Sequence, residues 1–175
     1  TDRLAPVGVL AHLDPDVTVI DVGKAPGRHA MAQEEINDLL VQRASAGEVV
    51  VRLKGGDPCV LGRGGEEALA CLQAGIPVEV VPGVTSAVAV PAAAGIPVTH
   101  RGVSTSFLML SAHDGAEEVV RRASGTPADT TLVILMGVRP LARVAEALIA
   151  AGRPADLPAA DVLGTLATVS VDAVN

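Results

Sequence analysis

Aromatic side chains are almost absent from this chain of 175 residues, which has no Trp, no Tyr and a single Phe, Phe107. Proteins that bind single-stranded nucleic acid stack its bases on aromatic rings, so this sequence excludes that class. Basic residues are outnumbered by acidic ones, and the formal net charge of -7 argues against a protein that binds phosphate backbones. We therefore expect a core of Val, Leu, Ile and Ala, and no nucleic-acid partner.

Cysteine is scarce as well. Cys59 and Cys71 are too few, and wrongly spaced, for a disulfide framework or a zinc site. We expect two free thiols in a reducing compartment and no bound metal. The chain is charged from its second residue and shows no signal-peptide pattern, which predicts a cytoplasmic protein with no membrane partner. The uncharged run 80–99 is long enough to cross a bilayer, but its prolines and glycines predict a loop, a short helix and a second loop instead.

Hydrophobic residues make up 49% of the chain, and their spacing predicts strands that alternate with helices. Short apolar runs predict strands at 17–22, 49–53, 78–81, 107–111 and 131–136. Helical periodicity, with acidic first turns or a glycine after the last turn, predicts helices at 34–46, 66–74, 86–94 and 140–151. Such alternation is typical of an α/β fold with parallel sheets flanked by helices. We expect two lobes, 1–97 and 98–175.

Four loops follow predicted strands, at 22–24, 54–58, 82–85 and 136–137, and ligands of parallel sheets bind beyond the carboxyl ends of the strands. In the second loop, Gly55 and Gly56 expose main-chain groups and Asp57 offers a carboxylate to a hydroxyl or amino group. A tight turn closed by the Asp57 side chain explains the same residues equally well. Thr85 fits a helix cap as well as a ligand contact, and Lys24 fits an ordinary surface lysine.

Together, and in their order along the chain, the loop sequences resemble one family. The longest matches are VVRLKGGDP at 50–58, GRGGEE at 62–67, PGVTSA at 82–87 and GIPVTHR at 95–101. Shorter ones are DRL at 2–4, VGK at 22–24, QEEIN at 33–37, LMG at 135–137 and GTL at 164–166. This set is similar to the uroporphyrinogen-III C-methyltransferases, which are S-adenosylmethionine-dependent enzymes of the tetrapyrrole methylase type. The matches extend over nearly the whole chain.

The resemblance implies a two-lobed tetrapyrrole methylase fold (class III methyltransferase) with its active site in the cleft between the lobes, and a homodimer. It implies methylation of uroporphyrinogen III at two pyrrole carbons to precorrin-2, for sirohaem or cobalamin synthesis. S-adenosyl-L-methionine would be the methyl donor and S-adenosyl-L-homocysteine the product, without a metal. The family's cofactor contacts fall on Gly55, Gly56, Asp57, Val60, Thr85, Ser86 and Met136. Its proton acceptor falls on Asp2 and its proton donor on Lys24.

The substrate implied by this resemblance carries many carboxylates, so an acidic protein must bind it through local arginines. We expect this role for the arginines of the candidate loops, which are Arg3, Arg28, Arg63 and Arg101. Pyrrole carbons are electron-rich enough to attack a sulfonium methyl group directly. Catalysis then needs alignment and the movement of one proton, and no nucleophilic side chain.

The sequence departs from the family pattern in several places. The resemblance implies a first strand and a glycine-rich loop before Thr1, a further stretch between about Ala160 and Asp161, and a last strand after Asn175, and all of these are missing from this sequence. Cys59 and Leu61 stand where the family usually has Phe, which makes one wall of the pocket smaller. Two other functions stay open: methylation of a later corrin intermediate, and a catalytically impaired module that binds S-adenosylmethionine.

Overall fold

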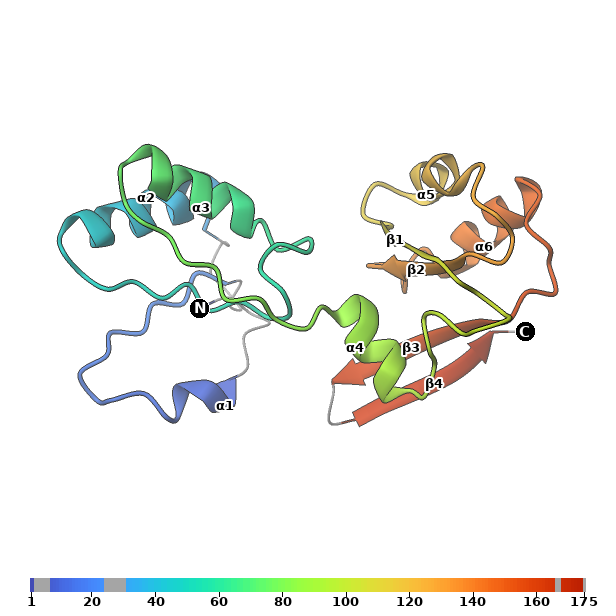
Figure 1. Ribbon diagram of the computed structural model, residues 1–175, viewed down its shortest axis with the longest axis horizontal. Helices are drawn as coiled ribbons and strands as arrows, with labels where there is room; N and C mark the ends of the chain where they lie inside the picture. Colours follow the sequence, from blue (N-terminus) through green and yellow to red (C-terminus); the bar gives the residue numbers. More distant parts are fainter. Residues whose placement is uncertain (2–6, 24–30, 166–167, 175) are drawn as a thin grey trace. The chain divides into compact units, whose positions relative to one another are not determined.

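A computed structural model describes the whole chain except residues 2–6, 24–30, 166–167 and 175 (Figure 1). The chain forms two compact units, Thr1–Thr85 and Ser86–Asn175. This division falls earlier in the chain than the lobe boundary expected at 97/98, and the two lobes as such stay a prediction. Among the described residues, no helix combines the length and the apolar composition that a membrane span requires.

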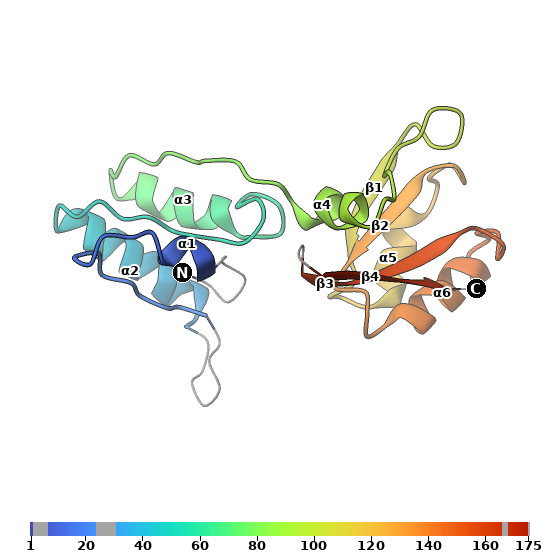
Figure 2. The same cartoon turned by 90° about the horizontal axis from the view of Figure 1, so that it is seen from below.

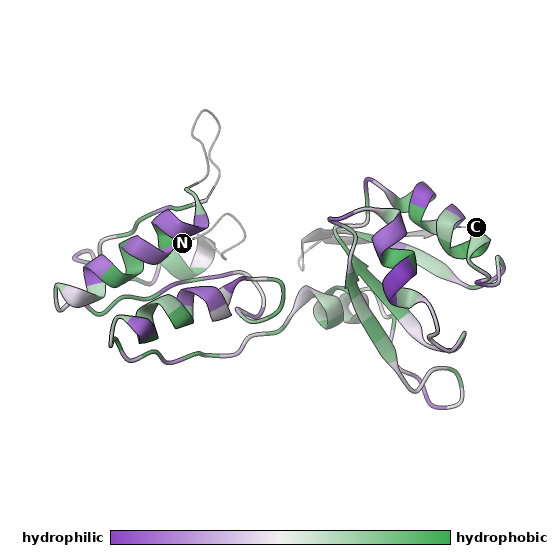
Figure 3. Cartoon of the chain, turned by 90° about the horizontal axis from the view of Figure 1, so that it is seen from above, coloured by the Kyte–Doolittle hydropathy of each residue, from purple (hydrophilic) through white to green (hydrophobic). Residues whose placement is uncertain are grey.

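The second unit contains a parallel strand pair with a helical crossover. Strand β1 (Phe107–Ser111) pairs with β2 (Thr131–Leu135), with Phe107 opposite Thr131 and Ser111 opposite Leu135. Helix α5 (Ala116–Ala123) connects the two strands, and α6 (Leu141–Ala150) follows β2. Both strands are mostly apolar (Figure 3). The predicted parallel pairing is thus confirmed for this unit.

The core of the second unit lies between this sheet and its helices. Val119 of α5 is fully buried and Val144 of α6 is 2% exposed. Leu110 of β1 packs in the same cluster, together with Ala112 and Ala123. An α5 side chain at this depth must be apolar, because a polar group without a partner there would lose its hydration. The core consists of small aliphatic side chains, as the composition predicts.

Two further elements complete the second unit. Helix α4 (Ser86–Ala93) contains Pro91, and strands β3 (Ala159–Thr165) and β4 (Thr168–Val174) form an antiparallel sheet of their own. Strand β3 runs without interruption through 160 and 161, where the family resemblance predicts a further stretch. The sequence analysis did not predict α5, β3 or β4. The alternation of Val and polar residues in 168–172 was a usable signal for β4.

The first unit consists of helices and extended segments. It contains α1 (Val7–Leu10), α2 (Gln33–Ser45) and α3 (Gly64–Gln73), and α2 packs against α3 (Figure 2). The predictions for the two longer helices are confirmed to within a turn. Glu35, the third residue of α2, accepts the main-chain N–H of Ala32 through its Oε2 at 2.7 Å. This contact satisfies one of the donors that a helix N-terminus leaves free.

The strands predicted at 17–22, 49–53 and 78–81 are wrong for this structure. These segments are extended, but no strand is assigned in the described residues of the first unit. Val49 is 95% exposed, Val51 78% and Val81 74%. A strand needs a neighbour for its N–H and C=O groups, which an apolar pattern alone does not supply.

Segment 17–22 has a short contact of this kind with Thr1. The amino group of Thr1 donates to the carbonyl of Ile20 at 2.8 Å, and the Thr1 carbonyl accepts the N–H of Val22 at 3.0 Å. This is the hydrogen-bond pattern of adjacent parallel strands. Val22 is one of the few buried apolar residues of the unit, at 8% exposure.

Candidate functional site

Two of the predicted loops lie against each other in the first unit, and Asp57 connects them. Its Oδ2 accepts the N–H of Gly83 at 3.0 Å, and its Oδ1 accepts the N–H of Cys59 at 2.8 Å. We call this pair of contacts the Asp57 latch. The contact with Cys59 closes an Asx-type turn, as the alternative interpretation of this loop proposed. The contact with Gly83 crosses from the 54–58 loop to the 82–85 loop, which a local turn does not explain.

The main chains of these loops approach so closely that position 83 must be glycine. A Cβ atom on Gly83 would lie 2.2 Å from the carbonyl oxygen of Gly56. Gly56 itself is exposed and has a φ of +72°, a conformation that other residues rarely adopt. The two loops therefore present main-chain N–H and C=O groups side by side.

The segment after the latch folds back on Pro58. The carbonyl oxygen of Pro58 accepts the N–H of Gly64 at 2.9 Å, and a Cβ atom on Gly64 would lie 2.5 Å from the same oxygen. Leu61 and Arg63 have φ values of 52° and 56°, in the left-handed region. Backbone strain of this kind is frequent at ligand sites. The arrangement leaves the path of the loop little freedom.

The charges of the site are set by hydrogen bonds. The N–H groups of Gly83 and Cys59 lower the pKa of the Asp57 carboxyl group, so this side chain is an anion near neutral pH. Arg63 donates to Glu66 at 2.9 and 2.7 Å, and this bidentate contact raises the pKa of Arg63 and lowers that of Glu66. Arg63 is thus oriented at the N-terminus of α3, where the main chain also attracts anions.

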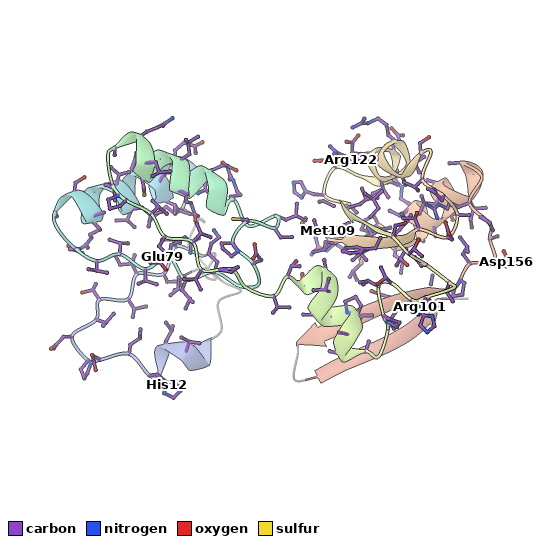
Figure 4. All side chains as sticks on the ribbon, in the orientation of Figure 1. His12, Glu79, Arg101, Met109, Arg122 and Asp156 are labelled. Carbon is purple, nitrogen blue, oxygen red and sulfur yellow. The ribbon has the colours of Figure 1, made fainter. Side chains whose placement is uncertain are left out.

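The remaining described candidates belong to the second unit. Met136 follows β2 with a φ of 57° and is 55% exposed, and Ser86 is the first residue of α4. Arg101 is exposed on the segment between α4 and β1 (Figure 4). A Met side chain after a strand is usually part of the core, but Met136 is exposed and has a left-handed backbone. Packing in the core therefore does not explain this residue.

The structure therefore places one group of predicted residues together within the first unit. Gly55, Gly56, Asp57 and Val60 belong to the latched loop, and Thr85 follows Gly83 by two positions. The other candidates of that half of the sequence lie outside the described residues, namely Asp2, Arg3, Lys24 and Arg28.

Glu67 is a residue of interest that the sequence analysis missed. It is 4% exposed and accepts hydrogen bonds from three side chains, one on α2 and two on the extended segment before residue 55. The sequence showed only an acid in the first turn of a helix, which is normally a solvated position. Cys71, one turn further along α3, is also buried, and burial raises the pKa of its thiol.

The sequence model of a known family matches residues 1–164, described as Tetrapyrrole (Corrin/Porphyrin) Methylases. The chain belongs to the tetrapyrrole methylases. A chloroplastic S-adenosyl-L-methionine-dependent uroporphyrinogen III methyltransferase of Arabidopsis thaliana is 46% identical over 164 residues, covering 92% of this chain and 44% of the relative. A protein of Methanosarcina barkeri with the same activity in its name is 44% identical, covering 97% of this chain and 72% of the relative.

Solved structures agree with this assignment. The uroporphyrin-III C-methyltransferase of Thermus thermophilus in complex with S-adenosylhomocysteine matches with a TM-score of 0.73 and 42% identity, over 99% of this tetrapyrrole methylase and 73% of that chain. A cobalt-precorrin-4 methyltransferase matches at 23% identity with a TM-score of 0.75 and supports the fold alone. The predicted fold class is confirmed. The chain spans less than two thirds of the length of several curated relatives, for example 44% of the Arabidopsis protein.

Proposed function

We propose that this tetrapyrrole methylase transfers methyl groups from S-adenosyl-L-methionine to two pyrrole carbons of uroporphyrinogen III and so forms precorrin-2. The support is the 44–46% identity to proteins named for this methylation, together with the match to a homologue whose structure contains S-adenosylhomocysteine. The pathway that uses the product, to sirohaem or to cobalamin, belongs to the same proposal.

The observation that carries the proposal is the Asp57 latch. It joins two loops that the family pattern assigns to the cofactor, and it is formed between residues 26 positions apart in the sequence. The residues fit a positively charged donor, since the latched loops place an anionic carboxylate beside main-chain N–H and C=O groups. Each carboxylate oxygen has more than one lone pair, so Asp57 can keep its main-chain contacts and still accept from a ligand.

S-adenosylmethionine supplies a methyl group bound to a sulfonium sulfur. In the proposed reaction a pyrrole carbon forms a bond to this methyl carbon, the carbon–sulfur bond breaks, and its electron pair stays on the sulfur. The methylated ring system then loses one proton. In the first unit the donor would be bound by Gly55, Gly56, Asp57, Val60 and Thr85. In the second unit its proposed contacts are Ser86 and Met136. Their task is to hold the reacting atoms in line.

The proposal also names the residues that transfer protons and those that bind the substrate. Asp2 would accept a proton and Lys24 would donate one. Arg3, Arg28, Arg63 and Arg101 would bind the carboxylates of the macrocycle, because a guanidinium matches a carboxylate with two parallel hydrogen bonds. Four further parts of the proposal rest on the family resemblance and the composition. They are an active site in a cleft between the lobes, a homodimer, no metal requirement and a cytoplasmic location.

Two measurements on the purified chain test the proposal. S-adenosylhomocysteine should raise the melting temperature, since a ligand that binds only the native state stabilises it. Incubation with uroporphyrinogen III and S-adenosylmethionine should produce the absorbance of the methylated product. Stabilisation without product would support the impaired binding module, and turnover of a later corrin intermediate alone would support the other alternative. No stabilisation and no product would overturn the proposal.

Matched variants assign the roles. Met136→Leu should raise the KM for S-adenosylmethionine, whereas Met109→Leu, the same change inside strand β1, should not. Arg63→Ala should raise the KM for uroporphyrinogen III, whereas Arg122→Ala on the exposed side of α5 should leave it unchanged (Figure 4). Equal values for both members of a pair would remove the site residue from the proposal.

A further inference from the structure

Glu67 is the most heavily used carboxylate in the described part of the chain. Lys54 donates to both of its oxygens at 3.0 Å, and Arg52 donates Nε to Oε1 at 3.2 Å. Gln33 of α2 also donates to Oε1, at 3.2 Å. We call these four side chains the Glu67 cluster. It connects α2, α3 and the extended segment that precedes the latched loop.

The Glu67 cluster is shielded from water. The side chain of Glu67 is 5% exposed, that of Lys54 8% and that of Arg52 16%. By contrast, the other ion pair of this helix end, between Arg63 and Glu66, has side chains more than half exposed. A surface pair of that kind adds little to stability, whereas removal of one partner from a buried group leaves an uncompensated charge.

Lys54 and Glu67 stand on either side of the loop that contains Asp57, so the cluster also bears on that loop. Lys54 immediately precedes Gly55, so it lies at the start of the loop that contains Gly56 and Asp57. Glu67 lies in the first turn of α3, which begins at Gly64, so the loop between Lys54 and α3 extends over residues 55–63. One carboxylate therefore connects the two ends of this loop at its base, while the Asp57 latch holds its tip to Gly83.

We propose that Glu67 is a positioning residue for the donor-binding loop: through Lys54 and Arg52 it sets the direction in which residues 55–58 leave the preceding segment. This inference rests on the proposed function, because the loop is taken to bind S-adenosylmethionine. Glu67 acts through the cluster and does not contact the ligand. The alternative role, in which Glu67 only joins α3 to α2 through Gln33, affects stability but not the loop.

The experiment compares Glu67→Gln and Lys54→Met with Glu48→Gln, which removes the carboxylate of an exposed ion pair in the same unit. Melting temperatures, S-adenosylhomocysteine affinities by calorimetry and amide exchange rates are measured well below the melting temperature of each variant. The amides of Cys59 and Gly83 report on the loop directly, since both donate to Asp57.

A positioning role predicts that Glu67→Gln and Lys54→Met both raise the Kd for S-adenosylhomocysteine by about tenfold or more, because displacements near 1 Å at a site have effects of this size. The Cys59 and Gly83 amides should exchange faster in both variants, and Glu48→Gln should match the wild type. Lys54→Met decides the matter if Glu67→Gln does not fold, because it leaves Glu67 paired with Arg52.

The variants could instead have a lower melting temperature, the wild-type Kd and slow amide exchange at Cys59 and Gly83. That result would overturn the positioning role and leave the proposed function intact. A wild-type chain that does not bind S-adenosylhomocysteine would instead overturn the proposed function. In that case the amide rates alone decide whether Glu67 orders the loop.

Discussion

The two units differ in how their apolar segments are arranged. Both contain apolar, β-branched segments, but in the second unit two of them pair as β1 and β2 over a core that includes Val119 and Val144. In the described residues of the first unit the corresponding segments form no strand and carry exposed valines, and polar contacts such as the Asp57 latch hold the loops together. Apolar sequence therefore produces a sheet only where a neighbouring strand is present, and hydrogen bonds from a side chain can hold two loops together without one.

The largest expected effect comes from charge in the core of the second unit. Val119→Asp should lower the free energy of unfolding by more than about 4 kcal/mol, because it buries an unpaired carboxylate. The same change at Val51, which is 78% exposed, should lower it by less than about 1 kcal/mol. Urea denaturation measures both. A large loss at Val51 would show that segment 49–53 is paired in solution, and the contrast between the units would disappear.

The next effect concerns the contact between the latched loops. Gly83→Ala should cost about 1–3 kcal/mol, because the new methyl group collides with the carbonyl of Gly56 and the loops must separate. It should also weaken S-adenosylhomocysteine binding. Gly65→Ala is the matched control, since a Cβ there meets no atom within 4 Å and the residue lies in helix α3. Denaturation and calorimetry that fail to separate the two variants would contradict the close approach.

A smaller effect should appear on acidification. The folded-state pKa of Asp57 is lowered by N–H donors, so the latch stabilises the fold above the ordinary value of 3.8 and this contribution is lost as pH falls through the lower folded value. The Cys59 and Gly83 amide signals should shift together as the carboxyl group is protonated. In Asp57→Asn this joint shift should be absent over the same pH range, and its persistence would assign the transition to another group.

The smallest effect belongs to the surface of the second unit. Hydrogen bonds from Arg121 and Arg122 lower the pKa of Glu118 to about 2. A carboxyl-carbon NMR titration should therefore show Glu118 protonating at a pH below the ordinary glutamate pKa of 4.5. Replacing both arginines with Gln should move the midpoint up toward that value. We expect little change in stability, because exposed ion pairs contribute little.

The sequence predicts local elements better than their pairing. The bounds of β1 are as predicted, and α2, α3, α4 and α6 are within a turn, because helical periodicity and glycine stops are local signals. The strand at 49–53 is wrong because pairing depends on residues far away in the sequence. Helix α5 was not predicted, although its acidic first turn and basic last turn were a usable signal.

The site shows the same limit. The loop motifs identify Gly55, Gly56 and Asp57 from the sequence, and the family resemblance adds Thr85 and Met136. The contact between Asp57 and Gly83 and the burial of Glu67 were not predictable, because nothing local distinguishes these acids from solvated ones. Glu66 and Glu67 are adjacent and chemically identical, yet one is exposed and the other buried. Only the packing of α3 on α2 and the 52–54 segment makes the difference.

The close approach of glycines to carbonyl groups has a consequence for protein engineering. Gly64 and Gly83 fix the course of the main chain, so libraries that randomise them should yield mostly inactive clones. Cys59 and Leu61 are exposed neighbours in the same loop and tolerate larger side chains sterically, although Leu61 needs its left-handed backbone. A search for altered ligand preference should therefore diversify these two positions and leave the glycine framework untouched.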